Sequence, residues 1–409
     1  MVLFWMSVAM IVSYLPWYNF SAVLKYISQE FNLTSADTGH IIAVFQAGYV
    51  LVVLLTGWLS DKLGAKRVVM GATLLTPIFS TSFVFVVYDK ESILIMRLLT
   101  GCAAGAIYVP GMALISDWFA PNERGGALGA YTAAITVANA GGYFIAGPIA
   151  ASDGWRVGML WTSAPVFLAF LIVWLLVKEK PMRKIDFDGT KALPAPQGGY
   201  SGPAVITGAY MGHMWELYAF WAWLGPFMVA CAAQSGMESN AAVKWGSLMA
   251  SVITMAGAPA VWLMGRVADK LGRTGTILIC ASASIMGEFV FGYMIGHGLG
   301  LIVFCGVWIG FWAVSDSAVY KAGLTDMCTA NIRATMLGLQ SAIGFSMTII
   351  APLAFGKVLQ MYNPGTDPTA ATIWGPAFVV LGIGALLAPV SAMFLRRFSQ
   401  ARLMADGRR

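Results

Sequence analysis

The sequence predicts an all-α membrane protein whose twelve transmembrane helices form two pseudo-symmetric six-helix bundles. Three observations predict this fold: the composition, the number of long apolar segments, and two charged loops that each occur twice. The chain has 409 residues, of which 58% are hydrophobic and only 11% are charged. Soluble domains contain about 25% charged residues. We therefore expect most of this chain to lie in lipid.

Twelve apolar segments are long enough to span a membrane, because a spanning helix needs about 20 mostly apolar residues. They lie near residues 3–24, 39–60, 68–88, 92–117, 125–150, 157–177, 201–231, 242–264, 274–296, 299–325, 334–360 and 372–395. The polar segment Lys178–Gly199, with its charges, prolines and glycines, separates the first six from the last six. We expect an N-terminal bundle over residues 1–177, a cytoplasmic linker over 178–200 and a C-terminal bundle over 201–409.

Lysine and arginine predict the orientation of the chain. Eighteen of them fall in the loops on the side of the linker and in the C-terminal tail, and five fall in the loops on the opposite side. Cytoplasmic loops carry the excess of these residues, so the linker and both termini are expected in the cytoplasm. The net charge of +6 is distributed over these loops, and no nucleic-acid partner is expected. No cleavable signal peptide is expected either, because the chain opens on an apolar segment with no basic residues before it.

Two charged loops repeat in the same order in the two halves. The segment Gly57–Arg67 (GWLSDKLGAKR) resembles Gly265–Gly275 (GRVADKLGRTG), which starts 208 residues later. The segment Asp117–Gly129 resembles Asp326–Gly338 at an offset of 209. Each loop lies between the same pair of spans in its half, so the simplest explanation is a six-helix unit that was duplicated in parallel orientation.

Because of these repeated loops, the whole chain resembles the major facilitator superfamily of transporters. The loop after the second span matches the family signature G-x-L-[AS]-D-[RK]-x-G-[RK]-[RK], except that Ala65 stands where a basic residue is usual. The resemblance implies that the charged cluster latches one of two access states. The latch would comprise Gly57, Asp61, Gly64 and Arg67, their counterparts Gly265, Asp269, Gly272 and Arg273, and the aligned arginines Arg124 and Arg333. A cluster that only anchors the topology is the alternative.

Ionisable side chains within spans are candidates for function, because each costs roughly 2.5–3.5 kcal/mol to insert into lipid. In the fourth span, Arg97 shares a helix face with Gly101, Gly105 and Tyr108. The segment resembles the R-x-x-x-G motif of the superfamily, which implies a role for Arg97 in proton coupling or in binding anionic substrates. An arginine that snorkels to the outer interface is the alternative.

In the seventh span, His213 and Glu216 lie along one helix face. A carboxyl group beside an imidazole in hydrocarbon can take up and release a proton near neutral pH. We expect Glu216 to carry the proton, or to bind a cationic part of the substrate, with His213 tuning it. A structural hydrogen bond between helices is the alternative for this pair.

Two further charges, Asp316 and Lys321, lie in the tenth span. The aligned positions in the first half are Ile107 and Met112, so these charges break the repeat. A symmetric scaffold usually loses its symmetry where the ligand binds, which makes both residues candidates for substrate binding or coupling. Glu288 lies in the ninth span, which the resemblance places at the periphery, away from the cavity.

Asn139 in the fifth span and two aromatic groups complete the predicted site. Trp17 and Trp221 belong to aromatic groups in spans one and seven, which are the first helices of their halves and should face each other across the cavity. An aromatic floor with a few charges suits a small organic ion, and it also suits an amphipathic drug.

The sequence therefore predicts a secondary active transporter that moves a small organic solute, an organic ion or a metabolite, across a bacterial-type inner membrane by alternating access with protons. A multidrug efflux proton antiporter is the alternative within the family. A membrane receptor or assembly partner that transports nothing is the alternative of another class, and a membrane enzyme is disfavoured because the sequence has no catalytic motif. The sequence also has no nucleotide-binding loop and no metal-ligand spacing. We expect no cofactor and no metal, and the resemblance implies a monomer.

Overall fold

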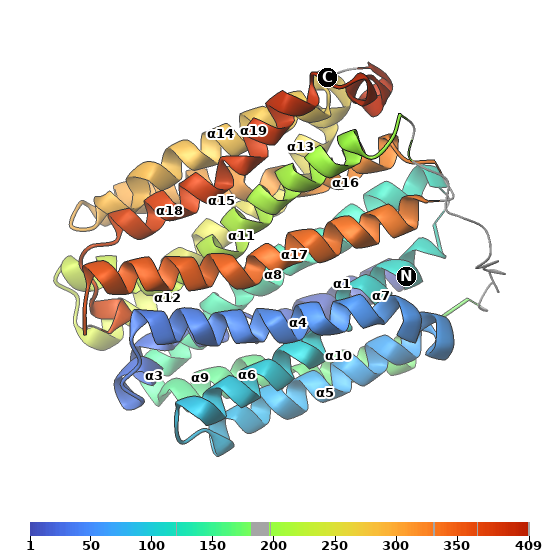
Figure 1. Cartoon of the computed structure of the whole chain (residues 1–409). Helices are drawn as coiled ribbons and strands as arrows, with labels where there is room; N and C mark the ends of the chain where they lie inside the picture. Colours follow the sequence, from blue (N-terminus) through green and yellow to red (C-terminus); the bar gives the residue numbers. More distant parts are fainter. Residues whose placement is uncertain (120, 181–195, 197, 330–331, 366, 408–409) are drawn as a thin grey trace.

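The computed structural model describes residues 1–119, 121–180, 196, 198–329, 332–365 and 367–407. Within this part of the chain the fold is entirely helical, which confirms the predicted all-α class. The helices run side by side in one direction of the molecule, and those before and after the linker form two neighbouring groups (Figure 1). Both chain termini lie at the same end of the bundle (Figure 1).

The N-terminal half contains α1 Val2–Tyr14, α2 Asn19–Ala22, α3 Leu24–Glu30, α4 Ser35–Leu63, α5 Ala65–Val86, α6 Lys90–Ala104, α7 Tyr108–Ser116, α8 Pro121–Asp153, α9 Trp155–Ser163 and α10 Val166–Leu176. The C-terminal half contains α11 Ser201–Gln234, α12 Ser239–Met255, α13 Gly257–Leu271, α14 Arg273–Phe291, α15 Leu299–Ser315, α16 Ser317–Asp326, α17 Arg333–Tyr362, α18 Gly375–Ala385 and α19 Leu387–Leu395. Three short 3-10 helices accompany them, η1 Gly292–Met294, η2 Pro368–Ala370 and η3 Ser399–Gly407.

Eleven segments of the described helices are long and apolar enough to cross a membrane. The remaining predicted span is the first, which begins with α1 and continues into α2 and α3. Pro16 lies in the break between α1 and α2, where it has no N–H to donate to the preceding turn. The arrangement therefore fits the predicted twelve spans, with the first one broken.

Spans four and ten break at equivalent positions. Residues 105–107 separate α6 from α7, and Asp316 separates α15 from α16. The residues that follow the two breaks, Tyr108 and Ser317, both line the cavity between the halves. Irregular backbone is tolerated at this depth only where protein or a cavity surrounds it, so the breaks mark the interior of the molecule.

The first pair of repeated loops also repeats in conformation. Gly64 follows α4 with φ 89° and ψ 140°, and Gly272 follows α13 with φ 89° and ψ 159°. This region of backbone space is accessible at low cost only to glycine. In both halves the glycine turns the chain directly into the next helix, α5 or α14. The duplication seen in the sequence is thus a duplication of structure as well.

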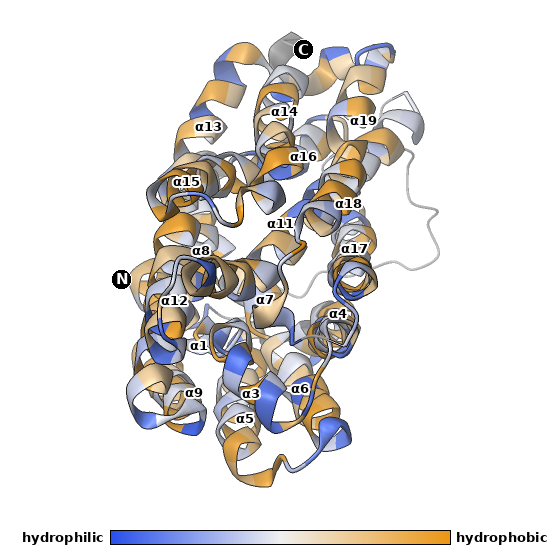
Figure 2. Cartoon of the chain, turned by 90° about the vertical axis from the view of Figure 1, so that its left-hand side faces the viewer, coloured by the Kyte–Doolittle hydropathy of each residue, from blue (hydrophilic) through white to orange (hydrophobic). Residues whose placement is uncertain are grey.

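Hydrophobic residues recur along the helices of the bundle (Figure 2), and many large apolar side chains are exposed. Trp161 on α9, Trp262 on α13 and Phe304 on α15 are each at least 60% exposed. A protein in water would hide such residues, whereas lipid tails solvate them without penalty. The distribution agrees with a protein that is embedded in a membrane.

At the end opposite the linker, side chains fix the starts of two spans. Thr34 and Asp37 form a capping box at the start of α4, and Asp89 and Ser92 form another at the start of α6. Hydrogen bonds from Ser92 hold the pKa of the Asp89 carboxyl below its ordinary value. Lys90 pairs with Asp37, which connects the two helix starts.

Candidate substrate-binding site

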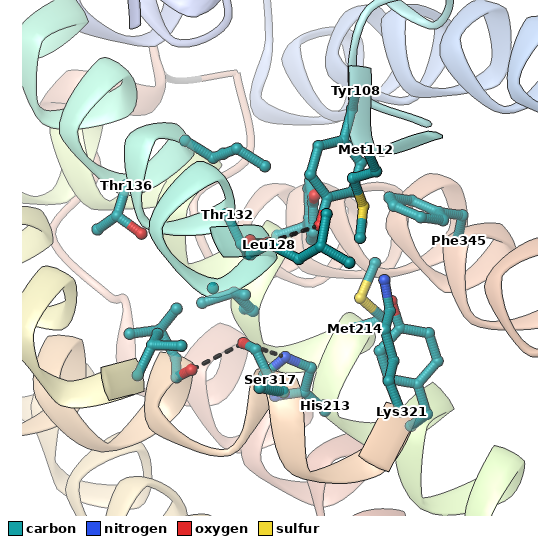
Figure 3. Close-up of a pocket in the computed structure, with 18 of the residues that line it drawn as sticks. Tyr108, Met112, Leu128, Thr132, Thr136, His213, Met214, Ser317, Lys321 and Phe345 are labelled. Carbon is teal, nitrogen blue, oxygen red and sulfur yellow. Dashed lines mark hydrogen bonds between the residues drawn. The ribbon is translucent and has the colours of Figure 1, made fainter. Parts of the chain in front are cut away.

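A cavity of about 180 Å³ lies between the two halves (Figure 3). The N-terminal half contributes Tyr108, Met112, Leu128, Gly129, Thr132, Ile135 and Thr136 to its wall. The C-terminal half contributes Tyr210, His213, Met214, Leu217, Tyr218, Trp221, Val261, Val314, Ser317, Ala318, Lys321 and Phe345. A mostly apolar and aromatic wall with a few polar groups is typical of small-molecule sites.

A buried polar cluster in the C-terminal half reaches the cavity through His213 and Ser317. His213 Nδ1 lies 3.0 Å from Asp316 Oδ1, and both side chains are at most 3% exposed. His213 Nε2 lies 2.9 Å from Ser317 Oγ, and Figure 3 shows these two side chains next to each other. Tyr320 donates a hydrogen bond of 2.5 Å to Asp316 Oδ2. An imidazole and a carboxylate so close together can share and exchange one proton.

The break in span ten explains why Asp316 can make these contacts. Its backbone leaves the helical path, with φ −93° and ψ 1°, and its carbonyl accepts a hydrogen bond of 2.8 Å from the N–H of Val319. An aspartate before a helix often caps that helix with its side chain. Here the side chain makes no such bond to α16. It contacts His213 and Tyr320 instead, so the carboxyl group belongs to the buried polar cluster.

Lys321 brings a positive charge to the same wall. It follows Ser317 by one turn of α16, and its Nζ lies 5.6 Å from the ring centre of Tyr108 in the other half. Among the described residues, no acidic side chain forms an ion pair with Lys321. Met112, its counterpart in the repeat, also lines the cavity, and Figure 3 shows Lys321 reaching toward it. The ammonium group is therefore free to bind an anion.

Glu216 is buried, but it is not part of the cavity wall. The expected contact with His213 does not form, because the imidazole faces Asp316 and Ser317 on the neighbouring span. The Oε1 atom of Glu216 has no hydrogen-bond partner, and Ser284 is the polar side chain within its reach. Spacing along one helix placed both residues on one face, yet packing against span ten decided where the ring points.

Arg97 is also buried and also lies outside the cavity wall. Its guanidinium lies 4.2 Å from the ring centre of Phe45 and 5.1 Å from that of Phe20, and it donates a hydrogen bond of 3.4 Å to the carbonyl of Trp17. Because only 4% of the residue is exposed, the guanidinium does not snorkel to the interface. It is held between aromatic rings in the N-terminal half, with its Nε atom unpartnered.

The predicted aromatic residues meet between the halves. Trp221 lines the cavity, whereas Trp17 lies behind Tyr218, with 6.2 Å between the ring centres. Tyr143 of α8 donates a hydrogen bond of 2.6 Å to the carbonyl of Trp221. Asn139 is buried away from the cavity wall, and its Oδ1 atom has no hydrogen-bond partner.

The halves are joined tightly between the cavity and the end opposite the linker. Tyr26 donates a hydrogen bond of 2.8 Å to Asn240, and the N–H of Ser35 donates one of 3.0 Å to Gln360. Spans two and eleven touch through their backbones, since a Cβ on Gly39 would lie 2.7 Å from the carbonyl oxygen of Pro352. The two halves are therefore in direct contact at this end of the molecule.

The C-terminal copy of the predicted latch contains a cluster of charges. Arg273 bonds to Asp269 at 2.6 Å and to Asp326 at 3.3 Å. Arg333 donates a hydrogen bond of 3.4 Å to the carbonyl of Cys328. Among the described residues, a Cβ on Gly265 would meet nothing within 4 Å.

The N-terminal copy contacts the first residues of the linker. The backbone N–H of Lys66 donates a hydrogen bond of 3.0 Å to Glu179, whose carboxyl group lies against Gly64. Arg67 is exposed. The side-chain surroundings of Asp61 and Arg124, the packing at Gly57 and most of the predicted linker, 178–200, lie outside the described part of the structure.

Sequence reasoning did not select several residues of the cavity wall. Thr132 bonds to Tyr108 at 3.0 Å, and Tyr210 and Phe345 add aromatic surface. The repeat contains a signal for Tyr108, because this residue aligns with Ser317 of the other half at the offset of 209. Thr132 and Phe345 are ordinary residues for a membrane span, so no pattern in the sequence marks them.

Two related six-helix halves around a cavity, in an apolar helical bundle, define a membrane transporter for small molecules. The chain belongs to the Major Facilitator Superfamily, whose sequence profile matches residues 6–243, more than half of the chain. This match confirms the resemblance seen in the charged loops, and it makes the chain a transporter rather than an enzyme.

Relatives agree with this assignment. The chain is 22% identical over 384 residues to the hexuronate transporter of Bacillus subtilis, covering 88% of this chain and 87% of the relative. It is 25% identical over 369 residues to the 3-(3-hydroxy-phenyl)propionate transporter of Escherichia coli, with coverage of 88% and 87%. The fold matches the crystal structure of a bacterial homolog of the human lysosomal transporter Spinster in an inward-facing and occupied conformation, with a TM-score of 0.76 at 14% identity over 97% of this chain and 96% of that one.

Proposed function

We propose that this protein is a proton-coupled transporter of a small organic anion that carries a carboxylate group. The observation that carries the proposal is the unpaired ammonium group of Lys321 on an otherwise apolar and aromatic cavity wall. A carboxylate can bind this charge while the rest of the solute contacts rings such as Tyr218 and Phe345. The two relatives named above are transporters of carboxylate ions, which supports the same class of solute here.

The size of the cavity favours a metabolite over a drug. Sites for drug-sized molecules enclose about 300–1,000 Å³, whereas this cavity has about 180 Å³. A compact organic acid suits this volume, and a multidrug antiporter would need more space. A receptor or assembly partner, the alternative outside transport, has no need for a charged cavity between two rocking halves.

Asp316 and His213 supply the proposed coupling to protons. The pair meets the cavity through Ser317, one turn of α16 before Lys321. A proton on the pair and a carboxylate on Lys321 lie near each other, so each stabilises the other electrostatically. Substrate and proton then favour the same conformation, which is the condition for coupled movement.

Contacts at the two ends of the molecule support the proposal of alternating access. At the end opposite the linker, backbones of spans two and eleven touch and side chains bond across the interface. At the linker end, Arg273 forms ion pairs with Asp269 and Asp326 of its own half. Release of the first set and engagement of the latch would expose the cavity to the other side.

The charge bias of the loops orients the linker and both termini toward the cytoplasm of a bacterial-type cell, with the monomer as the working unit.

A transport assay in proteoliposomes tests this function. Radiolabelled hexuronate and 3-(3-hydroxy-phenyl)propionate serve as probes, with and without an inward-directed proton gradient. We expect saturable uptake that the gradient stimulates and that other small carboxylates compete. The proposal fails if no carboxylate shows saturable flux, or if only amines or neutral drugs do.

The variant Lys321→Gln sharpens the assay. Losing one partner of a buried charge pair costs about 2 kcal/mol or more, so carboxylate affinity should fall at least about thirtyfold. Lys357→Gln is the matched control, because Lys357 is exposed on α17 outside the cavity. Equal losses in both variants would contradict a specific role for Lys321.

A further inference from the structure

The C-terminal half contains a second group of acidic side chains that the cavity does not explain. Span nine, formed by α14, carries Cys280, Ser284 and Glu288 at intervals of four residues, so they share one helix face. All three are fully buried. Glu216 of α11 has Ser284 within hydrogen-bonding reach, and it is close enough to Glu288 to interact electrostatically.

Neither glutamate has a cation to neutralise it. Among the described residues, no lysine, arginine or histidine forms an ion pair with Glu216 or Glu288. Both carboxyl oxygens of Glu288 and the Oε1 atom of Glu216 have no hydrogen-bond partner. Two ionised carboxylates buried this deeply without an ion-pair partner among the described residues would each cost several kcal/mol. The pair therefore holds at least one proton.

A polar path connects this pair to the cavity. The titratable groups that face Glu216 from the packed elements are Glu288 and Cys280 on α14 and Asp316 and Tyr320 in span ten. Asp316 in turn contacts His213, which lines the cavity. The acids form a series from the interior of the C-terminal half to the cavity wall.

The repeat indicates that these acids are not part of the scaffold. At the offset of 208 that relates the loops before α5 and α14, the counterparts of Ser284 and Glu288 are Thr76 and Ser80. The N-terminal half thus keeps a hydroxyl group at each position and has no acid there. The equivalent span of the N-terminal half therefore packs without a carboxyl group at this depth. We infer that Glu288 has a role other than packing.

We propose that Glu216 and Glu288 form a second proton-binding site behind the cavity wall, which exchanges its proton with the cavity through Asp316 and His213. When both carboxyl groups are protonated, the pair is neutral. Loss of one proton leaves a single negative charge shared by two carboxyl groups. The released proton passes to the Asp316 carboxylate and from there to the imidazole of His213, so Asp316 is an anion again after each transfer. The inference rests on the proposed proton-coupled function and extends it.

Infrared difference spectroscopy on the purified protein tests the site without transport. A pH change should alter the carbonyl stretching band of buried protonated carboxyl groups in the wild type, and Glu288→Gln and Glu216→Gln should each remove part of this change. Thr276→Val is the matched control, because Thr276 lies on the same face of α14, one turn from Cys280 toward the linker, and its hydroxyl bonds to the carbonyl of Gly272 at the start of the helix. The inference is overturned if both glutamine variants give the wild-type spectrum.

A transport readout separates this inference from the proposed function. In Glu288→Gln, the ratio of proton-driven accumulation to substrate exchange should fall by about tenfold, within the usual range for coupling between two ligands. Ser284→Ala keeps both acids but removes the hydroxyl group beside them, and it should lower the same ratio. This variant serves as the test if Glu288→Gln does not fold. An unchanged ratio in every folded variant contradicts the second site. A wild type that transports no carboxylate yet shows the titrating band contradicts the proposed function alone.

Discussion

Spans four and ten occupy equivalent places in the two halves, and they differ in charge where they meet the cavity. Both spans break in their middle, at Ile107 in one half and at Asp316 in the other. One turn and a half further on, Met112 faces the cavity from the first half and Lys321 from the second. The duplicated unit thus provides the cavity and the breaks, while the acid and the cation belong to span ten.

The buried arginine of span four completes this comparison. Arg97 aligns with Gly306 at the offset of the repeat. Arg97 lies between aromatic rings of its own half, whereas a Cβ on Gly306 would lie 2.4 Å from Ile253. One position therefore holds a charge in the first half and allows close helix contact in the second. Symmetric backbones carry different side chains for different tasks.

The largest expected effect comes from removing the acid of span ten. Asp316→Asn keeps the shape of the side chain but cannot accept and release a proton, so proton-driven accumulation should be abolished. A pH-sensitive dye inside proteoliposomes measures proton entry during substrate uptake. Asp153→Asn, at an exposed helix end, is the control. A variant at position 316 that still accumulates substrate against its gradient would refute the assignment of coupling to this span.

The second prediction moves the cation to the other half. Lys321→Met should weaken carboxylate binding at least about thirtyfold, and adding Met112→Lys should recover about tenfold of that loss. The reason is that both positions line the same cavity, so the ammonium group can approach the ligand from either wall. Isothermal titration with the carboxylate probes measures both affinities. If the double variant binds no better than Lys321→Met, the two walls are not equivalent and the comparison is wrong.

The third prediction concerns the repeated glycines at the linker end. Gly272→Ala and Gly64→Ala should each lower the free energy of unfolding by about 1–3 kcal/mol, because a side chain at φ 89° is strained. Thermal unfolding in detergent measures the change. Gly265→Ala is the matched control from the same motif, since a Cβ there meets open space. A loss in the control equal to that in Gly272→Ala would contradict a backbone origin of the effect.

The smallest expected effect concerns the bond between Tyr143 and Trp221 across the halves. Tyr143→Phe removes a hydrogen bond worth about 0.5–1.5 kcal/mol, which should shift the balance between access states roughly two- to tenfold. Hydrogen–deuterium exchange should become faster in α11 near Trp221. Tyr131→Phe is the control, because Tyr131 bonds to Ile107 within its own half. Equal exchange in both variants would show that this bond does not hold the halves together.

The sequence predicted the scaffold because periodic, local features determine it. Long apolar segments, the charged linker and two loop pairs at offsets of 208 and 209 were sufficient for the fold and the family. The turns before α5 and α14 also have local causes, in the positive-φ glycines Gly64 and Gly272. Such features need no knowledge of which helices become neighbours.

The site was predicted less completely because contacts between spans determine it. His213 and Asp316 were both selected, yet their pairing depends on how spans seven and ten pack. Glu216 was expected at the cavity but is not part of its wall, and it interacts electrostatically with Glu288, on a span that was expected at the periphery. Spacing along one helix identifies a face, but it does not say which neighbour that face meets.

The central claim is that the two halves rock about the cavity and expose it to one side at a time. Electron paramagnetic resonance distances test it in proteoliposomes, on a variant whose five cysteines are replaced. One pair of labels stands at the exposed positions Tyr88 and Met361, at the end opposite the linker, and a second pair at Leu63 and Leu271, which are equivalent positions at the linker end. With carboxylate and a proton gradient, the first distance should lengthen in part of the molecules while the second shortens. Distances that stay the same at both ends under every condition would contradict the account.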